Sequence, residues 1–239
     1  MQGRPRQSVV PGAQEGLTAP VGVALSAEIL ARGPWNPGDI EIAWRPEAFE
    51  PGADATAEAD RLLGRLRDRG SPSYDGLAAR MVSFEQKPDG LRLELQPIRW
   101  AMRLLRNDAG DSISALCVVR DSEGSWLAGR RAAWVASWAG RWALGAGGSV
   151  EVDENPTDTL ARELEEEWSV SPERLQVEAL IRLANGMVML VGQAWLAPGA
   201  LVSPDDEHDA FAWWPAEVER WPAEADSPLR KMGTLLAGA

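Results

Sequence analysis

The sequence predicts an α/β protein, in which an α/β sandwich with a mixed sheet is preceded by a smaller α+β N-terminal domain. Short apolar segments of strand length alternate with segments of helical period along the 239 residues. The polar stretch RNDAGDS, residues 106–112, interrupts this pattern. We therefore predict a disordered leader at residues 1–16, an accessory N-terminal domain at 17–109 and a larger domain at 110–239.

The N-terminal domain is expected to hold four strands and two helices. The Pro-Asp-Gly sequence at residues 88–90 has strong turn chemistry and predicts that the last two strands form a hairpin. The expected strands are residues 21–30, 40–44, 77–84 and 91–95, and the expected helices are residues 53–69 and 98–105.

The larger domain is expected to contain two hairpins, one turning at DSEG and the other at Asn185-Gly186. A helix is expected to begin at Thr157-Asp158, where polar and acidic residues precede an apolar stripe of period four. The expected strands are residues 113–120, 125–131, 132–137, 141–144, 175–183, 187–196 and 210–214. Two further helices are expected at residues 216–221 and 227–236.

The helix after Thr157 carries an unusual set of carboxylates. Glu163, Glu166 and Glu167 are separated by three and four residues, so their side chains lie on one helical face. Like charges at these spacings repel by a few tenths of a kcal/mol per pair, approximately, and helix propensity does not require them. A solvated acidic face is the simplest interpretation. The alternative is a divalent cation such as Mg2+, which takes oxygen ligands and bridges carboxylates to phosphates.

Residues around these carboxylates fit the cation hypothesis. Arg162 can pair with a carboxylate and hold it in one rotamer. Gly145, Gly147 and Gly148 precede the helix, and glycine lets backbone approach a metal or phosphate closely.

The stretch from Gly148 to Val170, GSVEVDENPTDTLARELEEEWSV, resembles the Nudix box, G-x5-E-x7-R-E-U-x-E-E-x-G-U. Ser169 stands where the family has glycine. A glycine just after a helix usually adopts a positive φ, which costs serine on the order of 1 kcal/mol, so either the helix ends differently or the strain is tolerated. The resemblance implies the Nudix α/β/α sandwich and metal-dependent pyrophosphate hydrolysis. It also implies metal ligands at Gly148, Glu163, Glu166 and Glu167, and Glu154 as an outer or second metal ligand.

Nudix enzymes often take one more carboxylate, or a histidine, from a loop outside the box. The acidic segment at residues 204–215 offers Glu207 as first choice and His208 as second. An exposed acidic turn and a structural histidine are the alternatives. The resemblance therefore implies catalytic roles for Arg162, Glu163, Glu166, Glu167 and Glu207, with Mg2+ as the cofactor and Mn2+ as its substitute. The base that takes a proton from water is Glu166, Glu167 or Glu207.

A weaker resemblance concerns the N-terminal domain. The segments DIEIAWRPEAF at residues 39–49 and YDG at 74–76, followed by a hairpin, are similar to a Nudix branch that hydrolyses UDP-glucose and UDP-galactose. This resemblance implies a nucleotide-sugar substrate, giving a nucleoside monophosphate and a sugar phosphate. The alternatives are ADP-ribose, dinucleotides, damaged nucleoside triphosphates, or a catalytically silent module that binds a nucleotide. The N-terminal domain would cover the pocket, influence substrate choice or form a homodimer interface.

The composition of the chain indicates which classes of partner and which cellular compartment to expect. A formal net charge of −12 argues against sequence-independent nucleic-acid binding, which needs basic surface. The single cysteine, Cys117, lies in an apolar run, is expected to be buried and fits a cytoplasmic setting. The polar first twelve residues predict no signal peptide, and residues 21–31 are too short for a membrane span.

Most of the 12 tryptophans are expected in the core; the candidates for stacking on a ligand are Trp44, Trp100, Trp138, Trp142 and Trp213.

Overall fold

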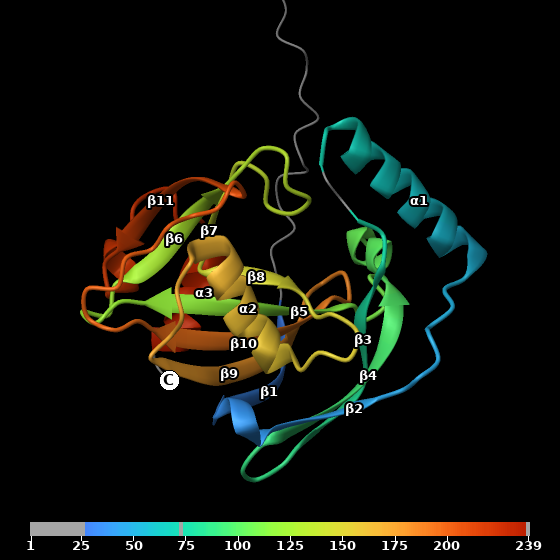
Figure 1. The fold of residues 1–239 in the computed structure, drawn as a ribbon, viewed down its shortest axis with the longest axis horizontal. Coiled ribbons are helices and arrows are strands. Elements are labelled where there is room, and N and C mark those ends of the chain that lie inside the picture. Colours follow the sequence, from blue (N-terminus) through green and yellow to red (C-terminus); the bar gives the residue numbers. More distant parts are fainter. Residues whose placement is uncertain (1–26, 72–73, 238–239) are drawn as a thin grey trace, which may run out of the picture.

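The computed structural model describes residues 27–71 and 74–237. The leader predicted at residues 1–16 and residues 21–26 of the first predicted strand lie outside this part of the chain. The described residues form a large mixed sheet with helices on both faces and a smaller sheet beside it, as Figure 1 shows. The predicted α/β sandwich is confirmed. Among the described residues, no helix is both long and apolar enough to cross a membrane.

The large sheet has the strand order β1-β9-β10-β5-β6-β11, with β7 paired to β6 and β8 paired to β5. The β5–β10 pair is parallel and the other pairs are antiparallel, so the sheet is mixed as predicted. The strands are β1 Glu28–Trp35, β5 Ile113–Arg120, β6 Trp126–Arg131, β7 Trp142–Leu144, β8 Ala146–Ser149, β9 Arg174–Arg182, β10 Val188–Trp195 and β11 His208–Trp214.

The small sheet comes from the N-terminal part of the chain and has the order β2-β4-β3. It contains β2 Ile40–Trp44, β3 Leu77–Gln86 and β4 Leu91–Arg99, and β3 and β4 form the predicted hairpin. Helix α1, Ala53–Asp68, packs against the 3-10 helix η2, Trp100–Leu104. The division of the chain near residue 110 stays a prediction, since β1 precedes it and yet pairs with β9.

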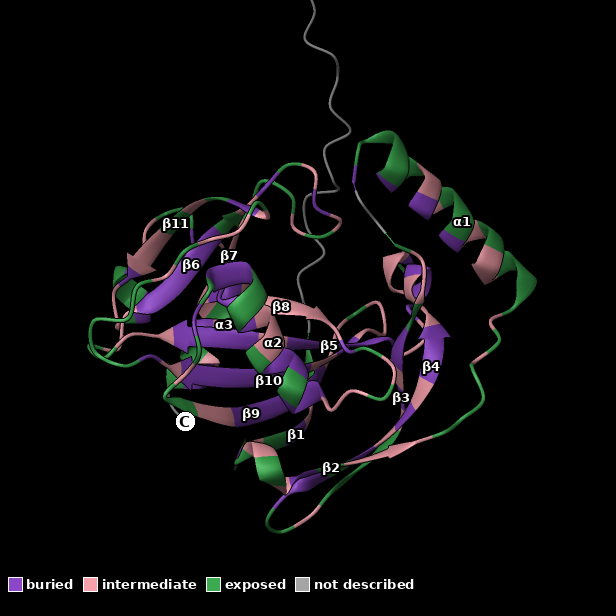
Figure 2. Ribbon diagram, in the orientation of Figure 1, coloured by how far each residue is buried: buried purple, intermediate pink, exposed green. Residues whose placement is uncertain are grey.

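The core lies on both faces of the large sheet. On one face, helix α2, Pro156–Trp168, buries Leu160, Leu164 and Trp168 in a cluster that also contains Leu91 and Leu93 of the small sheet. On the other face, helix α3, Ser227–Ala237, packs with tryptophans of β6 and β11 and with Trp221, which follows the 3-10 helix η3, Val218–Arg220. Figure 2 shows the central strands buried between these layers. This arrangement leaves the acidic side of α2 facing away from the core.

Several predicted elements differ from the structure. Residues 132–137 are not a strand but part of a loop between β6 and β7. The loop is closed by the Arg131 N–H, which donates to the Arg141 carbonyl, and by the Gly140 N–H, which donates to the Arg131 carbonyl. Its apolar residues line cavities instead of pairing with a neighbouring strand. Ile98 and Arg99 complete β4, so the predicted helix at 98–105 is reduced to η2, and the helix at 216–221 is reduced to η3. These short apolar runs are compatible with the period of a helix and with that of a strand, so packing against the rest of the chain determines which structure forms.

The hairpin predicted at Asn185-Gly186 is confirmed. Gly186 has a φ of 80°, and the backbone N–H of Leu183 donates to the carbonyl of Met187 at 2.8 Å. Asparagine and glycine accept this backbone conformation with little strain. The first hairpin pairs only Arg120 with Trp126, because β8 pairs with the earlier residues of β5. This pairing with β5 places the glycine-rich strand β8 next to α2.

Candidate functional site

Helix α2 is held at both ends by local contacts. Its N-cap is Asn155, two residues before the predicted start, and the Asn155 Oδ1 accepts the Thr157 backbone N–H at 3.0 Å. Pro156 occupies the first turn, where its missing N–H is harmless. At the other end Ser169 has φ 55° and ψ 39°, the left-handed conformation that glycine favours. The helix therefore ends with the geometry expected for a glycine, although the residue is serine.

The three glutamates of α2 line one cleft but differ in exposure. The side chains of Glu163 and Glu167 are 12% and 5% exposed, whereas Glu166 is 58% exposed at the rim. Burial raises the pKa of Glu163 above its usual value, and it raises that of Glu167 to about 8. The neighbouring carboxylate of Glu163 adds to the Glu167 shift, while Arg131 opposes it. Two carboxylates are thus held partly desolvated, which makes a cation favourable beside them.

Strand β8 brings bare backbone against these carboxylates. A Cβ built on Gly148 would lie 2.0 Å from the Oε1 of Glu163. Any residue other than glycine at this position would therefore displace the Glu163 carboxylate. The backbone N–H of Gly147 donates to the Oε1 of Glu167 at 3.3 Å. Gly145, which precedes β8, has a φ of 59°, and a Cβ there would lie 1.8 Å from the carbonyl oxygen of Cys117. The glycines thus allow the close approach that the sequence suggested.

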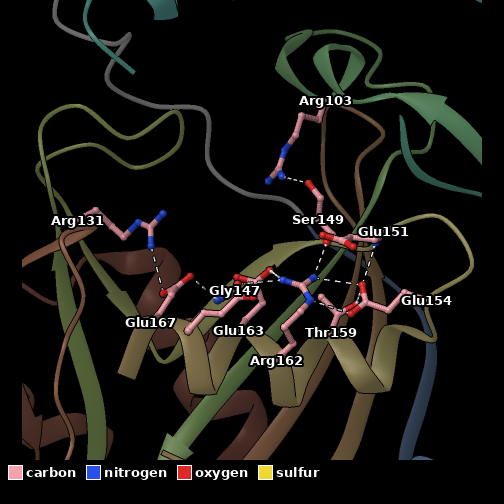
Figure 3. Close-up of polar contacts among 11 residues, drawn as sticks. Arg103, Arg131, Gly147, Ser149, Glu151, Glu154, Thr159, Arg162, Glu163 and Glu167 are labelled. Carbon is pink, nitrogen blue, oxygen red and sulfur yellow. Dashed lines mark hydrogen bonds and ion pairs between the residues drawn. The ribbon is translucent and has the colours of Figure 1, made fainter. Parts of the chain in front are cut away.

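Arg162 is the centre of an ion-pair network, which Figure 3 shows. Its Nε donates to Glu154 Oε1 at 2.9 Å, and one terminal nitrogen donates to Glu163 Oε1 at 2.7 Å and Glu166 Oε2 at 3.2 Å. The other donates to the Ser149 carbonyl at 3.2 Å. Burial opposes ionisation of Glu154, but hydrogen bonds from Arg162, the Glu151 backbone and Thr159, together with the charge of Arg162, outweigh burial and hold the pKa of Glu154 below the usual value. In this structure Glu154 orients Arg162.

A second arginine, which sequence reasoning missed, holds the other side of the cleft. Arg131 at the end of β6 donates to Glu207 Oε2 at 2.7 Å and to Glu167 Oε2 at 3.3 Å. The structure therefore brings Glu207 next to the glutamates of α2, although about 40 residues separate them in the chain. An arginine at a strand end carries no sequence signal that would pair it with distant carboxylates.

His208 lies in the interior. Its side chain is 1% exposed and packs on Trp168 with ring centroids 4.5 Å apart. Burial, assisted by Arg131, lowers its pKa to about 4, so the ring is neutral near pH 7. Its Nε2 lies 3.6 Å from Glu167 Oε2 and is buried without a hydrogen-bond partner among the described residues. This environment is that of a structural histidine beside Glu167.

The carboxylates face a cleft of about 720 Å³ between the N-terminal part of the chain and the large sheet. One wall comes from Tyr74, residues 76–78, Trp100 and Arg103, and the loop at 131–137 forms another. A second cavity of about 360 Å³, mostly apolar, adjoins it under α3. The residues that line both are Arg103, Arg131, Ser137, Gly147, Gly148 and Glu167. The two spaces therefore meet beside the buried carboxylates.

The tryptophans divide between core and cleft. Trp126, Trp168, Trp214, Trp221 and Trp35 are buried. Of the five stacking candidates, Trp100 and Trp138 each line a cavity, as does Trp134, which was not among them. Trp44, Trp142 and Trp213 instead pack, partly buried, against the two core clusters.

The donor set fits a hard divalent cation in its chemistry. Carboxylate oxygens of Glu163, Glu166 and Glu167, with glycine backbone close by, are the ligands that Mg2+ prefers. Among residues 27–71 and 74–237, no three carboxylate, histidine or cysteine side chains already converge to hold an ion. The carboxylate oxygens of the three glutamates form ion pairs with Arg131 and Arg162 instead. A cation would compete with these arginines for the same oxygens.

Solved structures similar to this chain include the MutT protein from Methanosarcina mazei Go1, 25% identical over 52% of this chain and 92% of that one, with a TM-score of 0.40. The NUDIX domain of Shewanella oneidensis NrtR, complexed with ADP ribose, is 20% identical over 55% and 90%, with a TM-score of 0.41. A C. elegans Ap4A hydrolase binary complex is 22% identical over 54% and 99%, with a TM-score of 0.39. No curated protein sequence matches the chain.

A family model described as the NUDIX domain matches residues 111–234, just over half of the chain. The matched region contains β8, α2 and the carboxylates of the cleft. The chain therefore belongs to the Nudix hydrolase superfamily of divalent-metal-dependent pyrophosphohydrolases.

Proposed function

We propose that this protein hydrolyses the pyrophosphate bond of a nucleoside diphosphate linked to a second moiety, with a nucleotide sugar such as UDP-glucose as the substrate. The products are a nucleoside monophosphate and a sugar phosphate. The observation that carries the reaction type is the pair of buried carboxylates, Glu163 and Glu167, held against the bare backbone of Gly147 and Gly148 at the wall of a large cleft.

In this proposal Glu163, Glu166 and Glu167, with the backbone of Gly148, hold Mg2+, and Mn2+ can substitute. The cation supplies neutralisation of the phosphate oxygens and acidification of a water molecule. Arg162 positions the carboxylates through its hydrogen bonds to Glu163 and Glu166. These contacts keep both carboxylates in one rotamer, which favours a fixed geometry for in-line attack.

The proton from the attacking water passes to a carboxylate at the cleft. Glu207 is our first choice, because it is 36% exposed, lies outside α2 and is oriented by Arg131 at 2.7 Å. Glu166 and Glu167 remain alternatives. The ion pair with Arg131 fixes the position of this carboxylate in the cleft, and a general base must be held within hydrogen-bond reach of the water that it deprotonates.

The nucleotide-sugar assignment rests on the N-terminal part of the chain. Its residues Tyr74, Trp100 and Arg103 line the same cleft as the carboxylates, and the cleft of about 720 Å³ is large enough for a molecule of this size. Trp100 and Trp134 offer aromatic faces for a base or sugar ring. ADP-ribose, a dinucleotide or a damaged nucleoside triphosphate is the alternative substrate.

The protein is proposed to act in the cytoplasm. Cys117, its single cysteine, is fully buried in β5 as predicted, and burial raises the pKa of its thiol to about 12. A thiol in this state is inert and needs no oxidising compartment. A homodimer through the N-terminal domain stays a prediction.

The test is chromatography of products after incubating a nucleotide panel with Mg2+ and the full-length protein. The variants are Glu167→Gln and, as a matched control, Glu165→Gln, which changes an exposed residue of the same helix. We expect UMP and a hexose 1-phosphate from a UDP-sugar with wild type and control, and a loss of at least about 100-fold in Glu167→Gln.

Cleavage of a different panel member would retain the mechanism and replace the nucleotide sugar. Near-wild-type turnover in Glu167→Gln would refute the metal site. Binding of nucleotides without turnover of any of them would make the protein a silent nucleotide-binding module.

A further inference from the structure

Arg103 comes from the N-terminal part of the chain but reaches into the cleft of the Nudix domain. It lies in η2, and its guanidinium donates a hydrogen bond to the hydroxyl of Ser149 at the end of β8. Figure 3 shows this side chain descending from η2 toward the carboxylates of α2. Ser149 directly follows Gly148, so Arg103 approaches the backbone that contacts Glu163.

The guanidinium stands where the two cavities meet. Arg103 lines both the cleft and the apolar cavity, as do Arg131 and Glu167. A molecule that extends from one space into the other must pass these residues. The central part of such a molecule would lie between the carboxylates of α2 and Arg103.

Arg103 differs from the other two arginines of the cleft in its charge balance. Arg162 and Arg131 each pair with carboxylates. Among the described residues, Arg103 forms no ion pair, and its polar contact is the neutral Ser149 hydroxyl. Burial lowers its pKa below the usual value, although Glu163 and Glu207 oppose this from a distance. A partly buried cation without a carboxylate partner is costly, and an anion beside it would offset that cost.

We propose that the Arg103 guanidinium binds the substrate's diphosphate directly, on the side opposite the carboxylates of α2. The inference rests on the proposed function and extends it, because it makes the N-terminal domain part of the substrate site. Arginine suits this role, since its planar fork donates two parallel hydrogen bonds to phosphate oxygens. The donors that Ser149 does not use are the ones available to the ligand.

A purely structural role is the competing explanation. Arg103 would then only join η2 to β8 through Ser149, and the cation–π contact with Trp100, at 5.6 Å from its ring centroid, would fix the side chain. That role predicts a change in stability but no specific change in affinity for a diphosphate. The two explanations therefore differ in a binding measurement.

The experiment uses the full-length protein and imidodiphosphate, a diphosphate analogue whose bridge resists hydrolysis, titrated calorimetrically in the presence of Mg2+. Arg103→Gln is compared with Arg106→Gln, which changes an exposed arginine three residues along the same segment. We expect Arg103→Gln to weaken binding by about tenfold to 100-fold, the loss of a charge-assisted hydrogen bond or two. Arg106→Gln should bind as wild type does. Equal affinity in Arg103→Gln and wild type overturns the proposal.

Arg103→Lys keeps the charge and decides the matter if the glutamine variant does not fold. It loses the fork, so binding should weaken about threefold to tenfold. Unchanged affinity in a folded Arg103→Lys contradicts a fork-type contact. Ser149→Ala removes the hydrogen bond between η2 and β8 and should leave imidodiphosphate affinity within about twofold. Equal weakening in Ser149→Ala and Arg103→Gln would assign the loss to the broken contact between η2 and β8 and would overturn the proposal.

Kinetics separate this proposal from the proposed function. With a hydrolysed panel member, Arg103→Gln should raise KM more than it lowers kcat, because it removes a contact made to the bound substrate. If wild type hydrolyses a substrate and Arg103→Gln has the same KM and imidodiphosphate affinity, only the role of Arg103 fails. If wild type neither hydrolyses the panel nor binds imidodiphosphate, both proposals fail.

Discussion

The carboxylate of Glu163 lies directly against Gly148: a Cβ built on this glycine would be 2.0 Å from Oε1 and 2.3 Å from the carboxyl carbon. One residue on β8 thus determines where a carboxylate on α2 can lie. Arg162 holds the same Oε1 from the other side at 2.7 Å. The carboxylate position is therefore set by a missing side chain and an ion pair together.

Replacing Gly148 with alanine is expected to displace the Glu163 carboxylate and lower kcat by about 100-fold, the effect of a misplacement near 1 Å. The fold should survive, with a loss on the order of 1 kcal/mol, because the atoms in the way are at the end of a flexible side chain. Steady-state kinetics and thermal melting check this. Gly64→Ala is the control, since nothing lies within 4 Å of its Cβ. Unaltered kcat in Gly148→Ala would show that the contact does not matter.

The stability of the metal-free protein should depend on pH through Glu167 and His208. Burial raises the pKa of Glu167 from 4.5 to about 8, so the folded state binds more protons than the unfolded state in this range and stability falls as pH rises. Burial lowers the pKa of His208 from 6.5 to about 4, which has the opposite effect between these values. The two effects offset each other below pH 6.5, and a net loss appears between pH 6.5 and 8.

Urea unfolding in a chelator at pH 6.5 and pH 8 measures this loss, whose upper limit is about 1.4 kcal/mol per pH unit. The loss should be clearly smaller in Glu167→Gln, where the raised pKa values of Glu163, Glu178 and Asp205 still contribute in the same direction. Glu165→Gln, exposed on the same helix, should behave as wild type. Identical pH dependence in wild type and Glu167→Gln would contradict the raised pKa.

Ser169→Gly should stabilise the protein. Serine at φ 55° and ψ 39° pays a steric cost that glycine avoids, on the order of 1 kcal/mol. The expected rise in Tm is about 2–4 °C for a protein of this size. Calorimetry measures it, with Ser171→Gly as a control that has no positive φ to relieve. A lower Tm in Ser169→Gly would mean that the serine side chain has a stabilising role.

Divalent cations should raise the thermal stability of the protein through the carboxylates of the cleft. Mg2+ at about 100 times its dissociation constant would add about 2.7 kcal/mol to the free energy of unfolding, and a chelator would remove it. The double variant Glu163→Gln/Glu167→Gln should show no such gain, because the two buried ligands are lost. Melting curves with Mg2+, Mn2+ and chelator test this. An equal gain in wild type and double variant would place the cation elsewhere.

Much of this protein follows from local sequence. The spacing of Glu163, Glu166 and Glu167 was enough to predict one acidic helical face, because helical period is a local property. The Asn185-Gly186 turn was predicted for the same reason, since it depends on a few neighbouring residues. The sequence left open how the helix ends at Ser169, and the structure shows a positive φ there. The family, too, was readable from 23 residues, and the match at 111–234 confirms it.

Other features depended on contacts between distant segments, which no local pattern encodes. The loop at 132–137 has strand-like composition. However, the neighbouring strand β6 already pairs with β7 and with β11, so the loop finds no free edge of β6 to pair with. Arg131 and Arg103 carry no motif, and they matter because folding brings β6 and η2 to the carboxylates of α2. Sequence alone thus determined that three glutamates share one face of a helix, through their type and spacing. The tertiary structure decided which charges surround them, because burial and long-range pairing exist only once the chain has folded.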